Sequence, residues 1–167
     1  MASPRTCISK HSGPAAGITL LEILIVLGLS TVICGFALLA SFESLRGYGF
    51  RNERDMLIAI LQKARSQAVS NLCSGSDCRN GQPHGVNIQP GRYILFQGAD
   101  YAHRDQPMDE IITANYDLTV SGILEVAFSR LSGDAAPASV GDIIISDPAG
   151  HSSVVSINSE GGITWTN

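Results

Sequence analysis

Glu22 is the residue whose type and setting most clearly suggest a specific chemical role. It is the only charged side chain among the 25 residues 18–42, which read ITLLEILIVLGLSTVICGFALLASF. A carboxylate in an apolar phase costs at least about 2.5 kcal/mol, so such a group is normally paired and functional. The alternative is that Glu22 lies near enough to the end of the apolar segment to reach lipid headgroups. Position alone leaves both interpretations open.

The cysteines suggest a second piece of chemistry. Cys73 and Cys78 are separated by four residues and follow a helical pattern. In an exported domain this spacing favours a disulfide that closes a small loop. Two unpaired thiols, or pairing with Cys7 or Cys34, are the alternatives. A structural zinc site needs four N or S ligands, which this loop and the neighbouring His84 do not supply.

Acidic and histidine side chains offer weaker candidates for a site. The acidic residues of one polar segment could bind calcium through oxygen ligands, but a solvated acidic loop is the commoner case; they are Asp100, Asp105, Asp109 and Glu110. Three histidines fall in predicted loops, where solvation is usual: His84, His103 and His151. Trp165 is expected to pack against a sheet.

No catalytic constellation is recognisable in the sequence. It contains no HExxH, no phosphate-binding GxxxxGK and no nucleophile elbow. We therefore predict no catalytic residue, no metal site and no cofactor, and we do not expect an enzyme. The formal net charge is −4, and no Lys or Arg follows Arg130. Because nucleic-acid affinity rests largely on Lys and Arg, no nucleic-acid partner is predicted.

The apolar run 18–42 has the length of a membrane span, which needs about 20 apolar residues in a helix. Arg5 and Lys10 precede it, so the positive-inside tendency places the N-terminus in the cytoplasm. A cleaved secretory signal peptide would have a shorter apolar region and a better small-residue site. A lipoprotein would need a small residue before its cysteine, but Ile33 precedes Cys34. An ordinary single-span anchor is possible, and would leave Glu22 unexplained.

The start of this run, Gly17-Ile18-Thr19-Leu20-Leu21-Glu22, resembles the signal sequence of type IV prepilins. In that family a basic leader ends in Gly, the first mature residue is apolar, and the fifth is Glu. The resemblance implies cleavage by a prepilin peptidase between Gly17 and Ile18, followed by N-methylation of Ile18. It also implies that Glu22 is an assembly carboxylate that faces the N-terminal amine of a neighbouring subunit. Ile18 departs from the commonest first residue, Phe.

The segments after the apolar run read as an amphipathic helix and then as short strands. Apolar residues recur at helical spacing: Leu57, Ile60, Leu61, Ala64 and Ala68. Beyond Gly85, apolar alternation separated by turn residues predicts antiparallel strands, including a hairpin around Pro90-Gly91. The predicted fold class is α+β, with a long N-terminal helix, half membrane-embedded and half amphipathic, packed on an antiparallel β-sheet as in pilins. The polar stretch from Gly98 to Ile111 is predicted to be a loop.

Four segments follow from this interpretation: a leader peptide at 1–17, a transmembrane half-helix at 18–42, an amphipathic half at 43–73, and a β-rich globular pilin domain at 74–167. The order of helix and strands resembles minor pilins and pseudopilins of the GspH/FimT type. That resemblance implies a structural subunit that primes assembly, or lies near the tip, of a type IV pilus or type II secretion pseudopilus. Its partners would be the prepilin peptidase, other pilins through the N-terminal helix, and the bacterial inner membrane, with the globular domain periplasmic. The alternative is a secreted or membrane-anchored periplasmic β-rich binding module.

Overall fold

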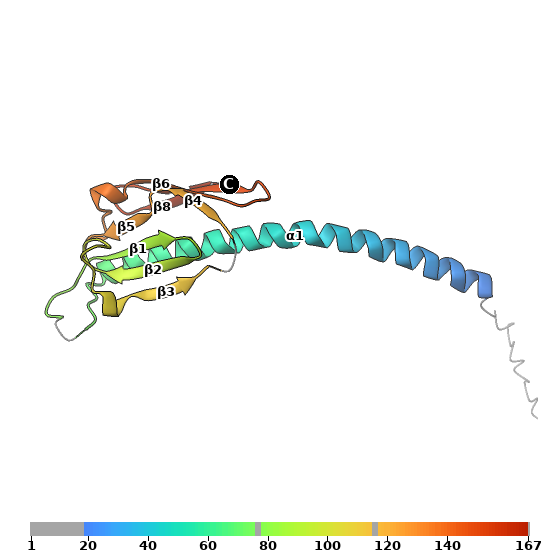
Figure 1. The fold of residues 1–167 in the computed structure, drawn as a ribbon, viewed down its shortest axis with the longest axis horizontal. Coiled ribbons are helices and arrows are strands. Elements are labelled where there is room, and N and C mark those ends of the chain that lie inside the picture. Colours follow the sequence, from blue (N-terminus) through green and yellow to red (C-terminus); the bar gives the residue numbers. More distant parts are fainter. Residues whose placement is uncertain (1–18, 76–77, 115–116, 167) are drawn as a thin grey trace, which may run out of the picture. The chain divides into compact units, whose positions relative to one another are not determined.

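The protein is described by a computed structural model covering residues 19–75, 78–114 and 117–166, with side chains of residues 37–46 left out. The helix α1 runs from Leu20 to Val69 (Figure 1). The chain divides into two compact units, Met1–Phe42 and Glu43–Asn167, which are described separately below.

The second unit contains two antiparallel four-stranded sheets (Figure 1). The first sheet has the order β3-β2-β1-β5, and its strands are β1 His84–Gln89, β2 Arg92–Gln97, β3 Glu110–Thr113 and β5 Glu125–Phe128. The second has the order β4-β6-β7-β8, with β4 Thr119–Gly122, β6 Gly141–Ser146, β7 Ser152–Ile157 and β8 Ile163–Thr166. Two short 3-10 helices, η1 Gln106–Met108 and η2 Pro137–Ser139, lie in the connections.

The core forms around the C-terminal part of α1. The predicted apolar stripe is confirmed as buried, and its residues share one cluster with side chains of both sheets, for example Leu57 and Leu61 of α1, Val86 of β1 and Ile143 of β6. The C-terminal part of α1 therefore packs against both sheets. Residues three and four apart share one helix face, so this spacing gives α1 a continuous apolar surface. Each fully buried side chain of this size contributes about 1.5–3 kcal/mol.

Backbone hydrogen bonds fix the C-terminal end of α1. Asn71 takes the left-handed conformation with a φ of 52°, which Asn tolerates better than most residues. The amide of Leu72 then donates to the carbonyl oxygen of Gln67 at 3.0 Å. The amide of Leu131 donates to the carbonyl oxygen of Ala68 at 2.9 Å. These bonds satisfy carbonyls that the end of a helix would otherwise leave unpaired.

The predicted fold class is corrected in two respects. The prediction placed one antiparallel sheet against a long helix, whereas the structure has two separate sheets. It also made the first half of the helix a membrane span. Within the described part of the chain, no helical stretch combines the length and apolar character needed to cross a membrane. The number of sheets was missed because alternation shows which face of a strand is buried but not which strands pair.

The polar segment predicted to be a loop from Gly98 to Ile111 is also more ordered than expected. It contains η1 and ends in β3, which pairs with β2 in the register Leu95↔Glu110 and Tyr93↔Ile112. The four residues of β3 carry too short a pattern to distinguish a strand from a loop. These residues form a strand because their backbone pairs with β2, and this pairing depends on the tertiary fold rather than on the local sequence.

Candidate functional site

Two of the three N-terminal site residues, Gly17 and Ile18, lie outside the described residues. The description begins at Thr19, whose side-chain oxygen accepts a hydrogen bond from the amide of Glu22 at 3.3 Å. The carbonyl oxygen of Thr19 accepts from the same amide at 3.1 Å and from Ile23 at 3.3 Å. Thr19 is therefore the N-terminal cap of α1.

Glu22 lies in the first turn of α1 and is exposed. An acidic side chain is favourable there, because the unpaired amides of the first turn carry partial positive charge. Thr19 and Glu22 also have the Ser/Thr-x-x-Glu spacing of a capping box. A local role thus accounts for an acid at this position without a partner chain. This role was not predicted, although its sequence signal, a Thr three residues before the Glu, is present.

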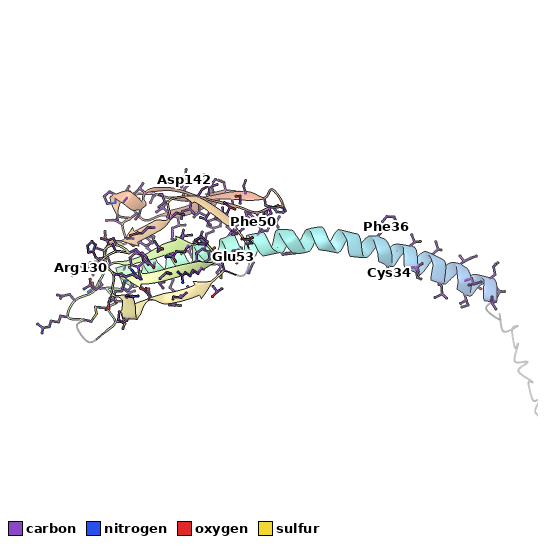
Figure 2. All side chains as sticks on the ribbon, in the orientation of Figure 1. Cys34, Phe36, Phe50, Glu53, Arg130 and Asp142 are labelled. Carbon is purple, nitrogen blue, oxygen red and sulfur yellow. A yellow bond between two sulfur atoms is a disulfide. The ribbon has the colours of Figure 1, made fainter. Side chains whose placement is uncertain are left out.

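The side chains of residues 19–36 are all exposed, and most of them are apolar. Figure 2 shows Cys34 and Phe36 projecting outward from this part of α1. Within 20–36, Glu22 is the only charged residue. A helix that is apolar on every side is normally surrounded by an apolar environment, either protein or lipid.

Cys73 and Cys78 form a disulfide, with their Cα atoms 5.7 Å apart. The residue after Cys73 is fixed by Gln97, the buried last residue of β2. The side-chain oxygen of Gln97 accepts from the amide of Ser74 at 2.8 Å, and its nitrogen donates to the Ser74 carbonyl at 3.0 Å. This paired bonding attaches the disulfide loop to the first sheet. An open polar cavity of about 340 Å³ lies between this loop and Arg104.

The acidic segment is not arranged as a calcium site. Three of its four carboxylates are bonded to cationic or histidine side chains: Asp100 to His103 at 2.8 Å, Asp109 to Arg104 at 2.8 Å, and Glu110 to Lys63 at 2.6 Å. In the described ranges, no group of three or more potential ligands is placed to hold a metal ion. The bond to His103 lowers the pKa of Asp100, as expected for a carboxylate whose charged form accepts hydrogen bonds.

The same segment covers the outer face of the first sheet. The ring of Tyr101 contacts that of Phe96 edge-on, with centroids 5.8 Å apart, and the guanidinium of Arg104 lies 3.8 Å from the Tyr101 ring centroid. The amide of Tyr101 donates to Glu125 at 2.8 Å. Tyr101 covers Phe96, which is buried and, like Ile94, lies outside the main core cluster. This second small core was not predicted.

Two buried titratable residues were also not expected. Glu53 of α1, labelled in Figure 2, is 0% exposed. It is hydrogen-bonded to Tyr93 of β2. Burial first, and then the neighbouring Glu53 charge, raise the pKa of Tyr93. His84, predicted to be solvated in a loop, is instead buried as the first residue of β1. Burial lowers the pKa of His84, and a hydrogen bond with the carbonyl of Gln82 partly opposes that shift.

Trp165, expected to pack against a sheet, is 48% exposed on β8.

Comparison of the chain with protein-family models, with curated proteins and with solved structures finds no match.

Proposed function

We propose that the chain is a pilin-like filament subunit, made with a leader that a prepilin peptidase removes after Gly17. The single observation that carries this proposal is Glu22. It is the only charge in the apolar run 18–42 and lies in the first turn of α1, among exposed apolar side chains. Cleavage after Gly17 would create a new amine at Ile18, next to the cap residue Thr19.

The paired-charge role of Glu22 follows from electrostatics. In a bundle of apolar helices, the carboxylate of one subunit would face the amine of another. A buried charge with a partner is tolerable, whereas an isolated one is strongly destabilising. The exposed apolar surface of residues 20–36 would become buried between neighbouring subunits. The favourable position of the Glu22 carboxylate in the first turn of α1 would persist in each subunit.

The place of action belongs to the same proposal. The basic leader would direct the subunit to the bacterial inner membrane, where the leader is removed, and the subunit would then enter a pilus or pseudopilus. The Cys73–Cys78 disulfide supports export of the second unit, since disulfides persist in oxidising compartments. The subunit would act structurally, as a minor pilin or pseudopilin, rather than as an enzyme.

Substitution of Glu22 tests the proposal and separates its two roles. In Glu22→Gln the side chain keeps the capping-box pattern and loses the charge. In Glu22→Ala both are lost. Filament fractions from cells should contain little of either variant if charge pairing drives entry. If Glu22→Gln enters filaments as well as the wild type, the capping role is sufficient and the pairing proposal fails.

A further inference from the structure

A groove of about 400 Å³ lies between α1 and β8. We call it the β8 groove; its lining includes Gln62, Arg65, Ser66 and Val69 of α1, with Gly161 and Ile163 on the other side. β8 is the last strand in the order β4-β6-β7-β8, so one of its backbone edges is not paired within the second sheet.

β8 is short, with four residues, but it lacks several other features that normally prevent strand addition. Natural edge strands are protected by charged side chains, proline, bulges or a covering element. The sequence of β8, ITWT, contains no charge and no proline. By contrast β3, an edge of the first sheet, begins with Glu110, which is held by Lys63 of α1 through bonds of 2.6 and 2.7 Å. Of these two edges, β8 is the one without a charged side chain.

An apolar surface continues from the core to this edge. Trp165 pairs with Val155 of β7, and directly opposed residues of a sheet lie on the same face. Val155 is 0% exposed, whereas Trp165 is 48% exposed. Ile163, two residues earlier on β8, shares that face and is only partly buried. The core face of the second sheet therefore extends past the part that α1 covers.

The groove also contains the cation Arg65, which donates to backbone carbonyl oxygens. Arg65 donates from Nε to the carbonyl oxygen of Gly133 at 3.1 Å and from Nη2 to that of Glu160 at 2.9 Å. Both acceptors are neutral backbone groups. Within the described ranges Arg65 forms no ion pair, whereas Lys63 on the same helix is paired with Glu110. A ligand with a carboxylate would supply the missing charge.

We propose that the β8 groove binds an extended, acidic segment of a partner protein, which adds to β8 as a further antiparallel or parallel strand. The backbone of β8 supplies hydrogen bonds, Ile163 and Trp165 contact alternate apolar side chains, and Arg65 binds a carboxylate. This mode of recognition combines main-chain bonding with pockets for every second side chain. A helix would leave the β8 edge unpaired, and a basic strand would be repelled by Arg65. The inference goes beyond the filament-subunit proposal and does not depend on it.

Trp165 makes the test direct, because it is the only tryptophan in the chain. Its emission is measured in the full-length protein in detergent micelles during titration with an acetylated hexapeptide of alternating Glu and Val. The matched hexapeptide of alternating Lys and Val is the control. We expect a saturable emission change with the Glu peptide and none with the Lys peptide. No change with the Glu peptide, or an equal change with both, would overturn the proposal.

Two variants locate the binding site. Ser66→Glu places a negative charge in the groove at an exposed position, and Ser121→Glu makes the same change on the exposed surface of β4, at the opposite edge of the second sheet. A repulsion of about 1 kcal/mol corresponds to roughly fivefold weaker binding for Ser66→Glu, with Ser121→Glu unchanged. Urea unfolding of both variants should match the wild type. Equal weakening by the two substitutions would show that the peptide binds elsewhere and would refute the proposal.

Discussion

Gly161 gives the sharpest test of the packing between α1 and the loops of the second sheet. It has a φ of +70°, in the left-handed region. A Cβ atom added there would overlap the carbonyl oxygen of Gly133 and approach Nε of Arg65 to 2.9 Å. Because the first obstacle is backbone, it cannot move aside as a side chain would. We therefore predict that Gly161→Ala strongly destabilises the folded unit.

The expected magnitude has two parts. A left-handed conformation costs a residue with a Cβ about 1–2 kcal/mol. Forcing an additional methyl group into a packed site costs about 1–3 kcal/mol more. Gly161→Ala should thus lower the free energy of unfolding by about 2–5 kcal/mol. Gly91→Ala is the matched control, because Gly91 has a φ of +74° but its added Cβ would meet nothing within 4 Å.

Urea unfolding monitored by Trp165 emission measures both variants. With a slope of about 1–3 kcal/mol per molar urea, the midpoint of Gly161→Ala should lie about 1 M below that of Gly91→Ala. Equal midpoints for the two variants would mean that the close contact with Gly133 does not exist. The same result would remove the structural basis for the position of Arg65 in the β8 groove.

Two further outcomes follow from the folded unit. Replacing both Cys73 and Cys78 with Ser should lower the free energy of unfolding by about 2 kcal/mol, because the bond closes only a small loop of the unfolded chain; an unchanged urea midpoint would contradict this. Burial lowers the pKa of His84 from its usual value of 6.5, so the unfolded chain binds a proton at higher pH than the folded one. The contribution of His84 to the free energy of unfolding should therefore be complete above about pH 6.5 and should decline as the pH falls below it. His84→Gln should unfold in urea with a weaker pH dependence across this range. An identical pH dependence in the variant would exclude His84 as the source.

The helix face and the first hairpin could be predicted from the sequence. Leu57, Leu61 and Ala64 follow the helical period closely, and all three are fully buried. The Pro90-Gly91 turn joins β1 and β2 as expected. These features depend on local periodicity and turn chemistry, which a sequence contains directly.

The division into two sheets and the cover over the outer face could not be predicted in the same way. Both depend on contacts between distant residues, such as Tyr101 with Phe96 and Glu125. One signal was nevertheless available: the centre of β2 reads Tyr-Ile-Leu-Phe, without alternation. A strand that is apolar on both faces is expected to be buried on both. That pattern could have indicated that something covers the second face.

At the N-terminal site, the sequence is more informative than the structure. Its sequence motif is compact, yet two of its three residues lie outside the described part of the chain. What the structure adds is the place of the Glu22 carboxylate in the first turn of α1, where an acid is favourable, beside the cap residue Thr19. Charge pairing and helix capping are compatible roles for Glu22. Only charge pairing requires a charged side chain, so a substitution that removes the charge distinguishes the two roles. The proposal of a filament subunit therefore depends most on whether the chain is processed next to Ile18.

The most direct test is N-terminal sequencing and intact-mass measurement of the protein from cells with an active prepilin peptidase. The account predicts a chain that begins at Ile18 and carries one methyl group on its new amine. A chain that retains its leader, or one that begins at Ser41 after the apolar run, would contradict it.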